Sequence, residues 1–145
     1  MEADSNTNPN ALGWAFATER RRDVILVVLW AVSITSVFAQ AIFQRGTATI
    51  WDLAILMAIS VAAGAICIDF GKAVLSYFFA MTIGMSLLLI LAILPALTGV
   101  IPPPGDSLLI TLWVSVIFKL VFPIPLFVLF LSSIAGAAIG EHYFY

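Results

Sequence analysis

The chain has 145 residues, of which 63% are hydrophobic and only 10% are charged. Ordinary soluble domains are about 45–50% apolar and about 25% charged, and a small domain buries only about 60–70% of the surface that its unfolded chain exposes. A soluble fold is therefore excluded, because it would leave a large apolar surface in water. Only six residues are basic and three of them are scattered singly, which is not the basic face of a nucleic-acid-binding protein. The single cysteine excludes an internal disulfide.

Residues 1–19 are predicted to form a polar tail in front of one transmembrane helical domain, residues 20–145. Residues 1–10 are polar and end in Asn8-Pro9-Asn10, a pattern typical of a disordered segment. Residues 11–19 carry Trp14 and Phe16 ahead of a basic run, which suits a short interfacial helix.

Three apolar runs follow, over residues 24–43, about 50–68 and 73–94. A helix of about 20 residues is about 30 Å long and crosses the hydrocarbon core of a bilayer. Each run is therefore predicted to be a membrane-spanning helix. The short polar segment 69–72 between the second and third runs predicts a tight helical hairpin.

The connection from Pro95 to Asp106 contains three consecutive prolines and is predicted to be an extended loop. The last apolar stretch, residues 107–140, would be about 50 Å long as one helix, and it contains Pro123 and Pro125. Three structures fit it: one long span kinked at the prolines, a re-entrant piece over 107–118 followed by a span over 120–140, or two short spans. The predicted fold is thus an all-α, polytopic transmembrane bundle of about four spans, the last one kinked or broken.

The basic residues predict the orientation of these spans. Arg20, Arg21 and Arg22 precede the first span, and Lys72 lies in the turn two spans later, so all four should share one side of the membrane. The positive-inside rule assigns that side to the cytoplasm. With four spans the C-terminus returns to the same side, and Arg45 lies alone outside. The host membrane is predicted to be the cell membrane.

Lys119 is the main candidate for a functional residue within the membrane. A charged side chain in a span costs several kcal/mol, about 3 on insertion scales, and normally faces a partner, a cavity or the interface. Lys119 precedes Pro123 and Pro125, so it would lie beside an interrupted helix and could contact a substrate or ion. The alternative is that its long side chain carries the ammonium group to the lipid headgroups.

Small residues recur at a spacing of four in three of the predicted spans. Such spacings let helix backbones approach closely, which is a main source of helix association in lipid. We expect them to pack helices within the chain, and to form a partner-binding face as the second alternative. The pairs are Ser60 and Gly64, Ala80 and Gly84, and Gly136 and Gly140.

The sequence contains no recognisable catalytic or cofactor-binding motif. It has a single histidine, His142, no Gly-x-Ser-x-Gly sequence and no glycine-rich phosphate loop. We therefore expect a protein that is not an enzyme and holds no metal or cofactor.

Two functions remain. The first is a helix-packing accessory subunit of a membrane complex, whose partners are the lipid bilayer and other membrane proteins. The second is a small homo-oligomeric transporter or channel that uses Lys119 and the Pro123/Pro125 break.

Overall fold

The computed structural model describes the backbone of residues 9–144 and the side chains of residues 18–143. Most of the predicted disordered tail, residues 1–8, lies outside this part of the chain. The described residues form helices joined by short turns, in the following order: α1 (Pro9–Gln40), the π-helical turn η1 (Ala41–Arg45), α2 (Ile50–Cys67), α3 (Phe70–Leu97), α4 (Gly105–Val121) and α5 (Ile124–Phe144).

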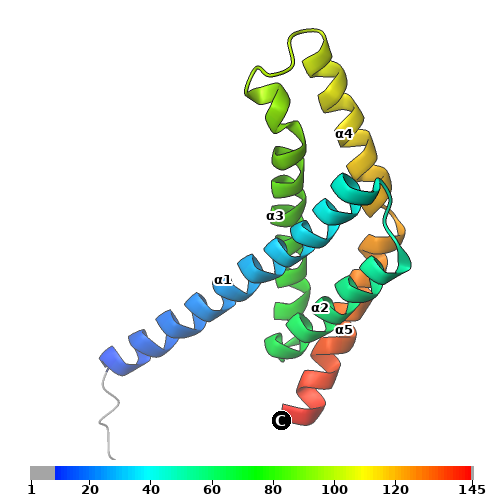
Figure 1. The fold of residues 1–145 in the computed structure, drawn as a ribbon. Helices are drawn as coiled ribbons and strands as arrows, with labels where there is room; N and C mark the ends of the chain where they lie inside the picture. Colours follow the sequence, from blue (N-terminus) through cyan, green and yellow to red (C-terminus); the bar gives the residue numbers. More distant parts are fainter. Residues whose placement is uncertain (1–8, 145) are drawn as a thin grey trace, which may run out of the picture.

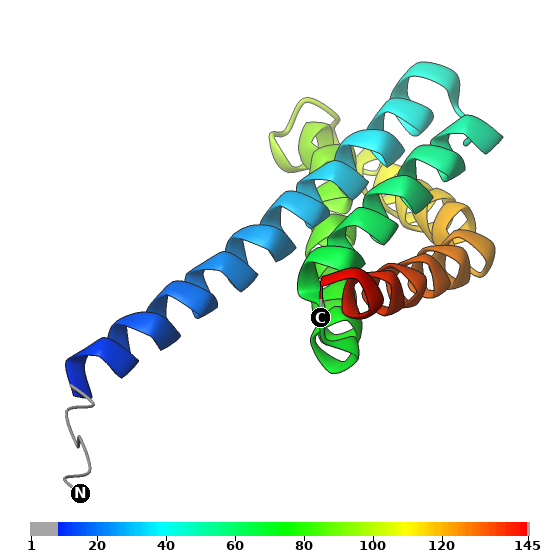
Figure 2. The same cartoon turned by 90° about the horizontal axis from the view of Figure 1, so that it is seen from below.

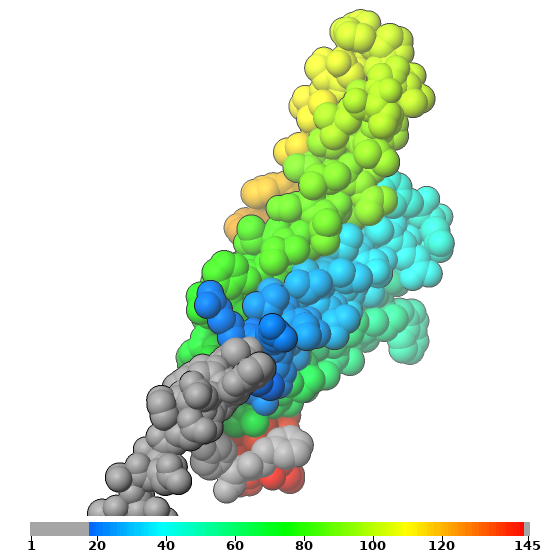
Figure 3. Space-filling model, turned by 90° about the vertical axis from the view of Figure 1, so that its left-hand side faces the viewer, coloured from blue at the N-terminus to red at the C-terminus, as the bar shows by residue number. Residues whose placement is uncertain are grey.

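Consecutive helices α1, α2 and α3 alternate in direction, and the two main packed pairs, α1 with α3 and α2 with α5, each run the same way (Figure 1). Viewed from below, α1 and α2 lie side by side and α5 runs close to α2 (Figure 2). The hairpin of α3 and α4 extends beyond α1 and α2 at one end of the molecule (Figure 1, Figure 3).

The predicted fold class is confirmed. Within the described residues, four helical segments are long and apolar enough to cross a membrane: residues 18–45, 50–67, 70–97 and 124–143. With so many apolar side chains on their outer faces, the chain is a membrane protein.

The N-terminal boundary differs from the prediction. Residues 11–19 do not form a separate interfacial helix, because α1 is continuous from Pro9 to Gln40. Proline is well suited to the first turn of a helix, where its missing N–H group would have no partner in any case. The segment 11–19 is therefore the first part of the helix that continues as the first span.

The turn between α2 and α3 is shorter than predicted. Ile68 takes a φ of 60°, and the N–H of Asp69 donates to the carbonyl of Cys67 at 2.6 Å. The carboxylate of Asp69 then caps α3 by accepting the N–H of Gly71 at 2.8 Å. Only Ile68 and Asp69 lie between the two helices, because the side-chain cap lets α3 begin at Phe70.

At its other end α3 runs past Pro95, which the sequence placed in the loop. Pro95 lies inside the last turn of the helix, which ends at Leu97. Both the N–H and the hydroxyl of Thr98 donate to the carbonyl of Leu94, at 3.0 Å each. The loop proper is thus confined to residues 98–104.

The last apolar stretch is broken rather than kinked. The helix ends at Val121 and restarts at Ile124. Pro123 and Pro125 lack the N–H groups that the carbonyls of Lys119 and Val121 would accept in a continuous helix. The helices α4 and α5 still run in the same direction, opposite to α3 (Figure 1), so together they form one interrupted element.

The core between α1 and α3 is made of large side chains and contains a hydrogen bond from one helix to the other. Trp30, Ile34 and Phe38 of α1 are buried in the same cluster as Tyr77 and Leu88 of α3. A hydrogen bond also joins the two helices in this core: the hydroxyl of Thr35 donates to the carbonyl of Gly84 at 3.0 Å.

The contact between α2 and α5 is made by small residues at backbone distance. A Cβ atom added to Gly64 would lie 2.1 Å from the carbonyl oxygen of Ser133, and one added to Gly136 would lie 2.1 Å from that of Val61. At Gly140 the distance to the carbonyl oxygen of Ala65 would be 2.5 Å. We call this contact the α2–α5 seam, and at its three glycines only hydrogen fits.

Candidate functional site

A cavity of about 690 Å³ lies between the turn that joins α1 to α2 and the break between α4 and α5. On one side it is lined by Thr49 and Asp52 and on the other by Lys119, Pro123 and Pro125. Most of the remaining lining is apolar. The cavity therefore brings together the predicted intramembrane residues and a carboxylate from the start of α2.

The chain turns from α1 into α2 through three local features. The end of α1 widens into the π-helical turn Ala41–Arg45, and Gly46 follows with a φ of 72°, a left-handed conformation that glycine adopts readily. The N–H of Gly46 donates to the carbonyl of Ile42 at 3.1 Å. Thr49 then becomes the N-cap of α2, so that Arg45 and Asp52 face each other across the turn.

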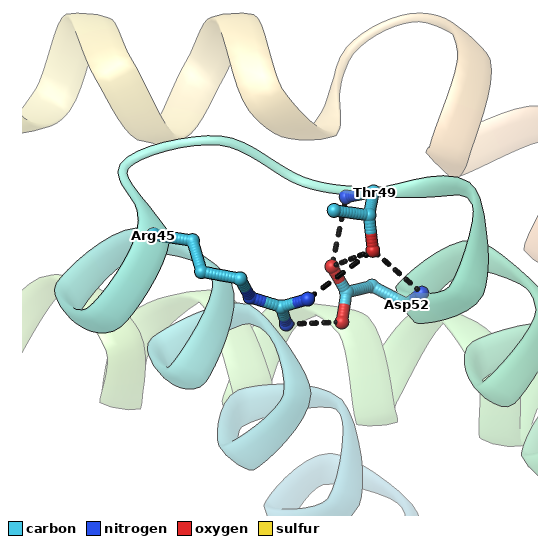
Figure 4. A network of polar contacts seen from close by, with 3 residues as sticks. All are labelled: Arg45, Thr49 and Asp52. Atoms are coloured by element: carbon cyan, nitrogen blue, oxygen red, sulfur yellow. Dashed lines mark hydrogen bonds and ion pairs between the residues drawn. The ribbon is translucent and has the colours of Figure 1, made fainter.

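Arg45, Thr49 and Asp52 form one connected polar network, which we call the polar corner (Figure 4). Guanidinium Nη2 of Arg45 lies 2.5 Å from Oδ1 of Asp52, and Nη1 donates to the hydroxyl of Thr49 at 3.2 Å. Oδ2 of Asp52 accepts both the N–H and the hydroxyl of Thr49, each at 2.8 Å. The N–H of Asp52 donates to the same hydroxyl at 3.4 Å.

The polar corner satisfies a carboxylate that is almost completely buried. The side chain of Asp52 is 6% exposed, whereas that of Arg45 is 39% exposed. A buried carboxylate is tolerated when it is paired and hydrogen-bonded, and a negative charge in the first turn of a helix is further stabilised by the helix dipole. The hydroxyl of Thr49 uses its one donor and both acceptor positions. The polar corner thus fixes the geometry of the α1–α2 turn.

Lys119 on the facing wall is exposed and, unlike Asp52, makes no hydrogen bond or ion pair within the described part of the chain. Its own carbonyl is one of the two that the prolines deprive of a partner in the next turn. The cavity wall at the helix break therefore offers a positive charge and a backbone acceptor. Because Arg45 already balances Asp52, the lining as a whole favours an anionic or hydrogen-bonding group.

The other predicted residues lie away from this cavity. Gly64 belongs to the α2–α5 seam together with Gly136 and Gly140, and Ser60 is buried on α2. Ala80 and Gly84 are buried on α3, where a Cβ atom on Gly84 would lie 3.2 Å from the carbonyl oxygen of Ala31 in α1. Each of the three pairs thus contributes at least one glycine to a contact between helices of the same chain.

The residues that predicted the orientation lie at the opposite end of the bundle. The carboxylate of Asp23, next to the run Arg20–Arg22, lies 3.9 Å from both the ammonium group of Lys72 and Nε of Arg22. The first basic run and the turn between α2 and α3 are therefore neighbours, as the positive-inside argument requires.

Sequence reasoning missed the polar corner. It assigned no role to Asp52 and treated Arg45 as an isolated charge. The available signal was the sequence Thr49-x-x-Asp52, because a threonine followed three residues later by an acidic residue forms a capping box at the start of a helix. Sequence alone gave no indication that Lys119 would lie across a cavity from this box.

Comparisons with protein-family models, curated proteins and solved structures find no match to this chain. Its function is therefore inferred from its own residues.

Proposed function

We propose that this chain is a non-catalytic subunit of a membrane complex, and that it acts by packing its exposed helical surface against other membrane proteins. The observation that carries the proposal is the closed middle of the bundle. Between the two charged ends, residues 24–44, 53–68, 73–105 and 120–140 contain no charged side chain. The α2–α5 seam, closed at backbone distance, runs through this region.

The hydroxyl groups in the middle of the bundle are largely used within the chain. Thr35 bonds to the carbonyl groups of Ala31 and Gly84. Ser132 and Ser133 bond to carbonyl groups of their own helix, and Tyr77 donates to the carbonyl of Leu126 at 2.6 Å. A conduit for solutes would need polar groups that are free to face an open path, and these groups are bonded to carbonyl groups of their own or a neighbouring helix instead.

The surface that best suits a partner is α4. Only Ile117 and Val121 of this helix are buried, whereas Leu108, Leu112 and Phe118 are 69%, 56% and 64% exposed. A partner helix on this face would also cover the region of Lys119. Both termini and the basic end of the bundle are assigned to the cytoplasmic side of the cell membrane in this proposal, in accordance with the positive-inside rule.

Site-specific photo-crosslinking in the native membrane tests the proposal. A photoreactive amino acid at Leu112 of α4 should give one crosslinked product of defined mass, and purification in mild detergent should recover the same partner in stoichiometric amount. The matched control is Leu131 of α5, which is 62% exposed and should crosslink to lipid. A monodisperse monomer with no product from Leu112 would contradict the proposal.

A second candidate function is a small homo-oligomeric transporter or channel. It is favoured by Asp52 and Lys119 lining one cavity beside an interrupted helix, since such breaks expose backbone groups to substrates in transporters. In this case Lys119→Leu should abolish solute flux in reconstituted vesicles. Unchanged flux would exclude this function without affecting the first.

A further inference from the structure

A second cavity, of about 470 Å³, lies at the basic end of the bundle between α1 and α3. Its lining is divided by chemistry. Arg20, Asp23 and Lys72 form the polar part. The remainder is dominated by aliphatic and aromatic side chains of the two helices, such as Val27 and Phe79. The cavity thus has a charged part and an apolar part.

The polar part carries more positive than negative charge. Arg20 and Lys72 contribute two cations, and Asp23 contributes one carboxylate. Asp23 holds its partners weakly, because both of its ion pairs measure 3.9 Å and its side chain is 42% exposed. Exposed pairs of this kind contribute little stability. An anion with one negative charge would therefore balance the site, and it could displace Asp23 from Lys72 at low cost.

The position of the charges matches the level of lipid headgroups. Arg20 and Lys72 precede the uncharged segments of α1 and α3, which begin at Val24 and Ala73. From Leu75 to Ile83, the lining residues of α3 extend about 12 Å into the span at 1.5 Å per residue. On the face seen in Figure 3, α1 lies along α3 in this region. A charged headgroup at the mouth would thus leave its acyl chain beside the apolar wall.

We propose that this cavity binds an anionic phospholipid, with the phosphate group held by Arg20 and Lys72 and one acyl chain along the wall formed by α1 and α3. Basic pockets between membrane-spanning helices are suited to such headgroups, and each basic residue near the membrane surface contributes about 1 kcal/mol. A soluble phosphate would satisfy the charges but leave the apolar wall without a ligand. The site is distinct from the cavity at Lys119 and independent of the proposed partner surface.

Native mass spectrometry of the full chain, released from vesicles of phosphatidylcholine and phosphatidylglycerol, tests the preference for an anionic lipid. The chain should retain phosphatidylglycerol, and Arg20→Gln and Lys72→Gln should each weaken retention about fivefold. The matched control is Arg21→Gln, which removes the same charge from the same run but from a residue that does not line the cavity. Equal losses in all three variants, or no preference in the unmodified chain, would overturn the proposal. Unchanged thermal melting of each variant shows that it is folded.

Alkylation of Cys67 tests whether the lipid occupies the cavity, because this residue lines the cavity and is the single cysteine of the chain. Alkylation of Cys67 should be slower in vesicles that contain phosphatidylglycerol than in phosphatidylcholine alone, and the protection should be lost in the Arg20→Gln/Lys72→Gln double variant. Protection by inorganic phosphate in phosphatidylcholine vesicles would show a soluble anion in place of a lipid. If Cys67 were protected in phosphatidylcholine vesicles and lost this protection when the protein was diluted with more lipid, the occupant would be a second protein. Either result overturns the proposal.

Discussion

The helices α4 and α5 derive from one apolar stretch of sequence, yet they are held in different ways. The glycines of α5 bring its backbone into contact with α2 at Val61 and Ala65. In contrast, α4 packs on α3 through larger side chains, and an apolar cavity of about 380 Å³ lies between them and the start of α5. The helix α5 is therefore packed at backbone distance within the bundle, whereas α4 contacts the bundle along one side through larger side chains.

The difference shows what determines helix packing when all surfaces are apolar. In lipid there is little hydrophobic gain when one helix covers another, so close packing of small residues decides the contact. The segment that forms α5 has Ser133, Gly136 and Gly140 at the contact, whereas α4 presents Trp113, Ile117 and Val121. Hydropathy alone does not distinguish how closely the two helices pack, whereas the size of the residues at the contact does.

The largest loss of stability is expected from Gly136→Ala, which should disrupt the packing of α5 on α2. The new Cβ atom would lie 2.1 Å from the carbonyl oxygen of Val61, a backbone atom that cannot move by itself. Overpacking of this kind costs about 3 kcal/mol. We expect a clear fall in the melting temperature of the detergent-solubilised protein.

The control is Ser60→Ala in the facing helix. Ser60 is fully buried and its hydroxyl has no hydrogen-bond partner among the described residues, so its removal should leave stability unchanged or raise it slightly. If Gly136→Ala and Ser60→Ala had equal effects, α5 would not be fitted to α2 as described.

The second-largest loss of stability is expected from Asp52→Asn, which tests whether the polar corner stabilises the cavity wall opposite α4. The substitution leaves the charge of Arg45 without its partner. Breaking a buried pair costs about 3–5 kcal/mol, and partial exposure of Arg45 reduces this to about 2 kcal/mol. Thermal unfolding measures the loss. The double variant with Arg45→Gln should recover part of it, and additive losses would show that the two residues are not coupled.

The sequence was sufficient to predict most of the fold. Three apolar runs of about 20 residues predicted α1, α2 and α3, because only a helix satisfies every backbone group in lipid. The prolines predicted the interruption of the last stretch but left three structures open. The choice among them depends on how α4 and α5 pack against α3 and α2, which is a tertiary property.

The candidate site was predictable only in part. Lys119, Pro123 and Pro125 stood out because charges and prolines are unusual in an apolar stretch. Asp52 did not, because a carboxylate at the end of a span is ordinary at an interface. Its burial depends on the π-helical turn and Gly46, which direct Arg45 back over α2.

A smaller effect, on shape rather than stability, is expected from replacing both Pro123 and Pro125 with alanine. The two restored N–H groups could pair with the carbonyls of Lys119 and Val121, and α4 and α5 would then tend to align as one helix. Spin labels at Leu112 and Leu131, in a chain with Cys67→Ala, should move apart. An unchanged distance distribution would show that packing, rather than the prolines, separates the two helices.

The smallest effect on the isolated chain is expected from Phe118→Ala. This side chain is 64% exposed, and surface substitutions usually change stability by less than about 0.5 kcal/mol. The melting temperature of the purified chain should therefore stay the same, while the amount of co-purified partner falls. A marked loss of stability would show that α4 is fitted as closely as α5.

The central claim is that α4 and α5 together cross the membrane once, so that the loop before α4 and the C-terminal end lie on opposite sides. Single cysteines at Thr18, Val100 and Tyr143, each in a Cys67→Ala background, can be labelled with a membrane-impermeant thiol reagent in sealed vesicles of known orientation. The account predicts that positions 18 and 143 react from the cytoplasmic side and position 100 from the opposite side. Reaction of positions 100 and 143 from the same side would contradict it.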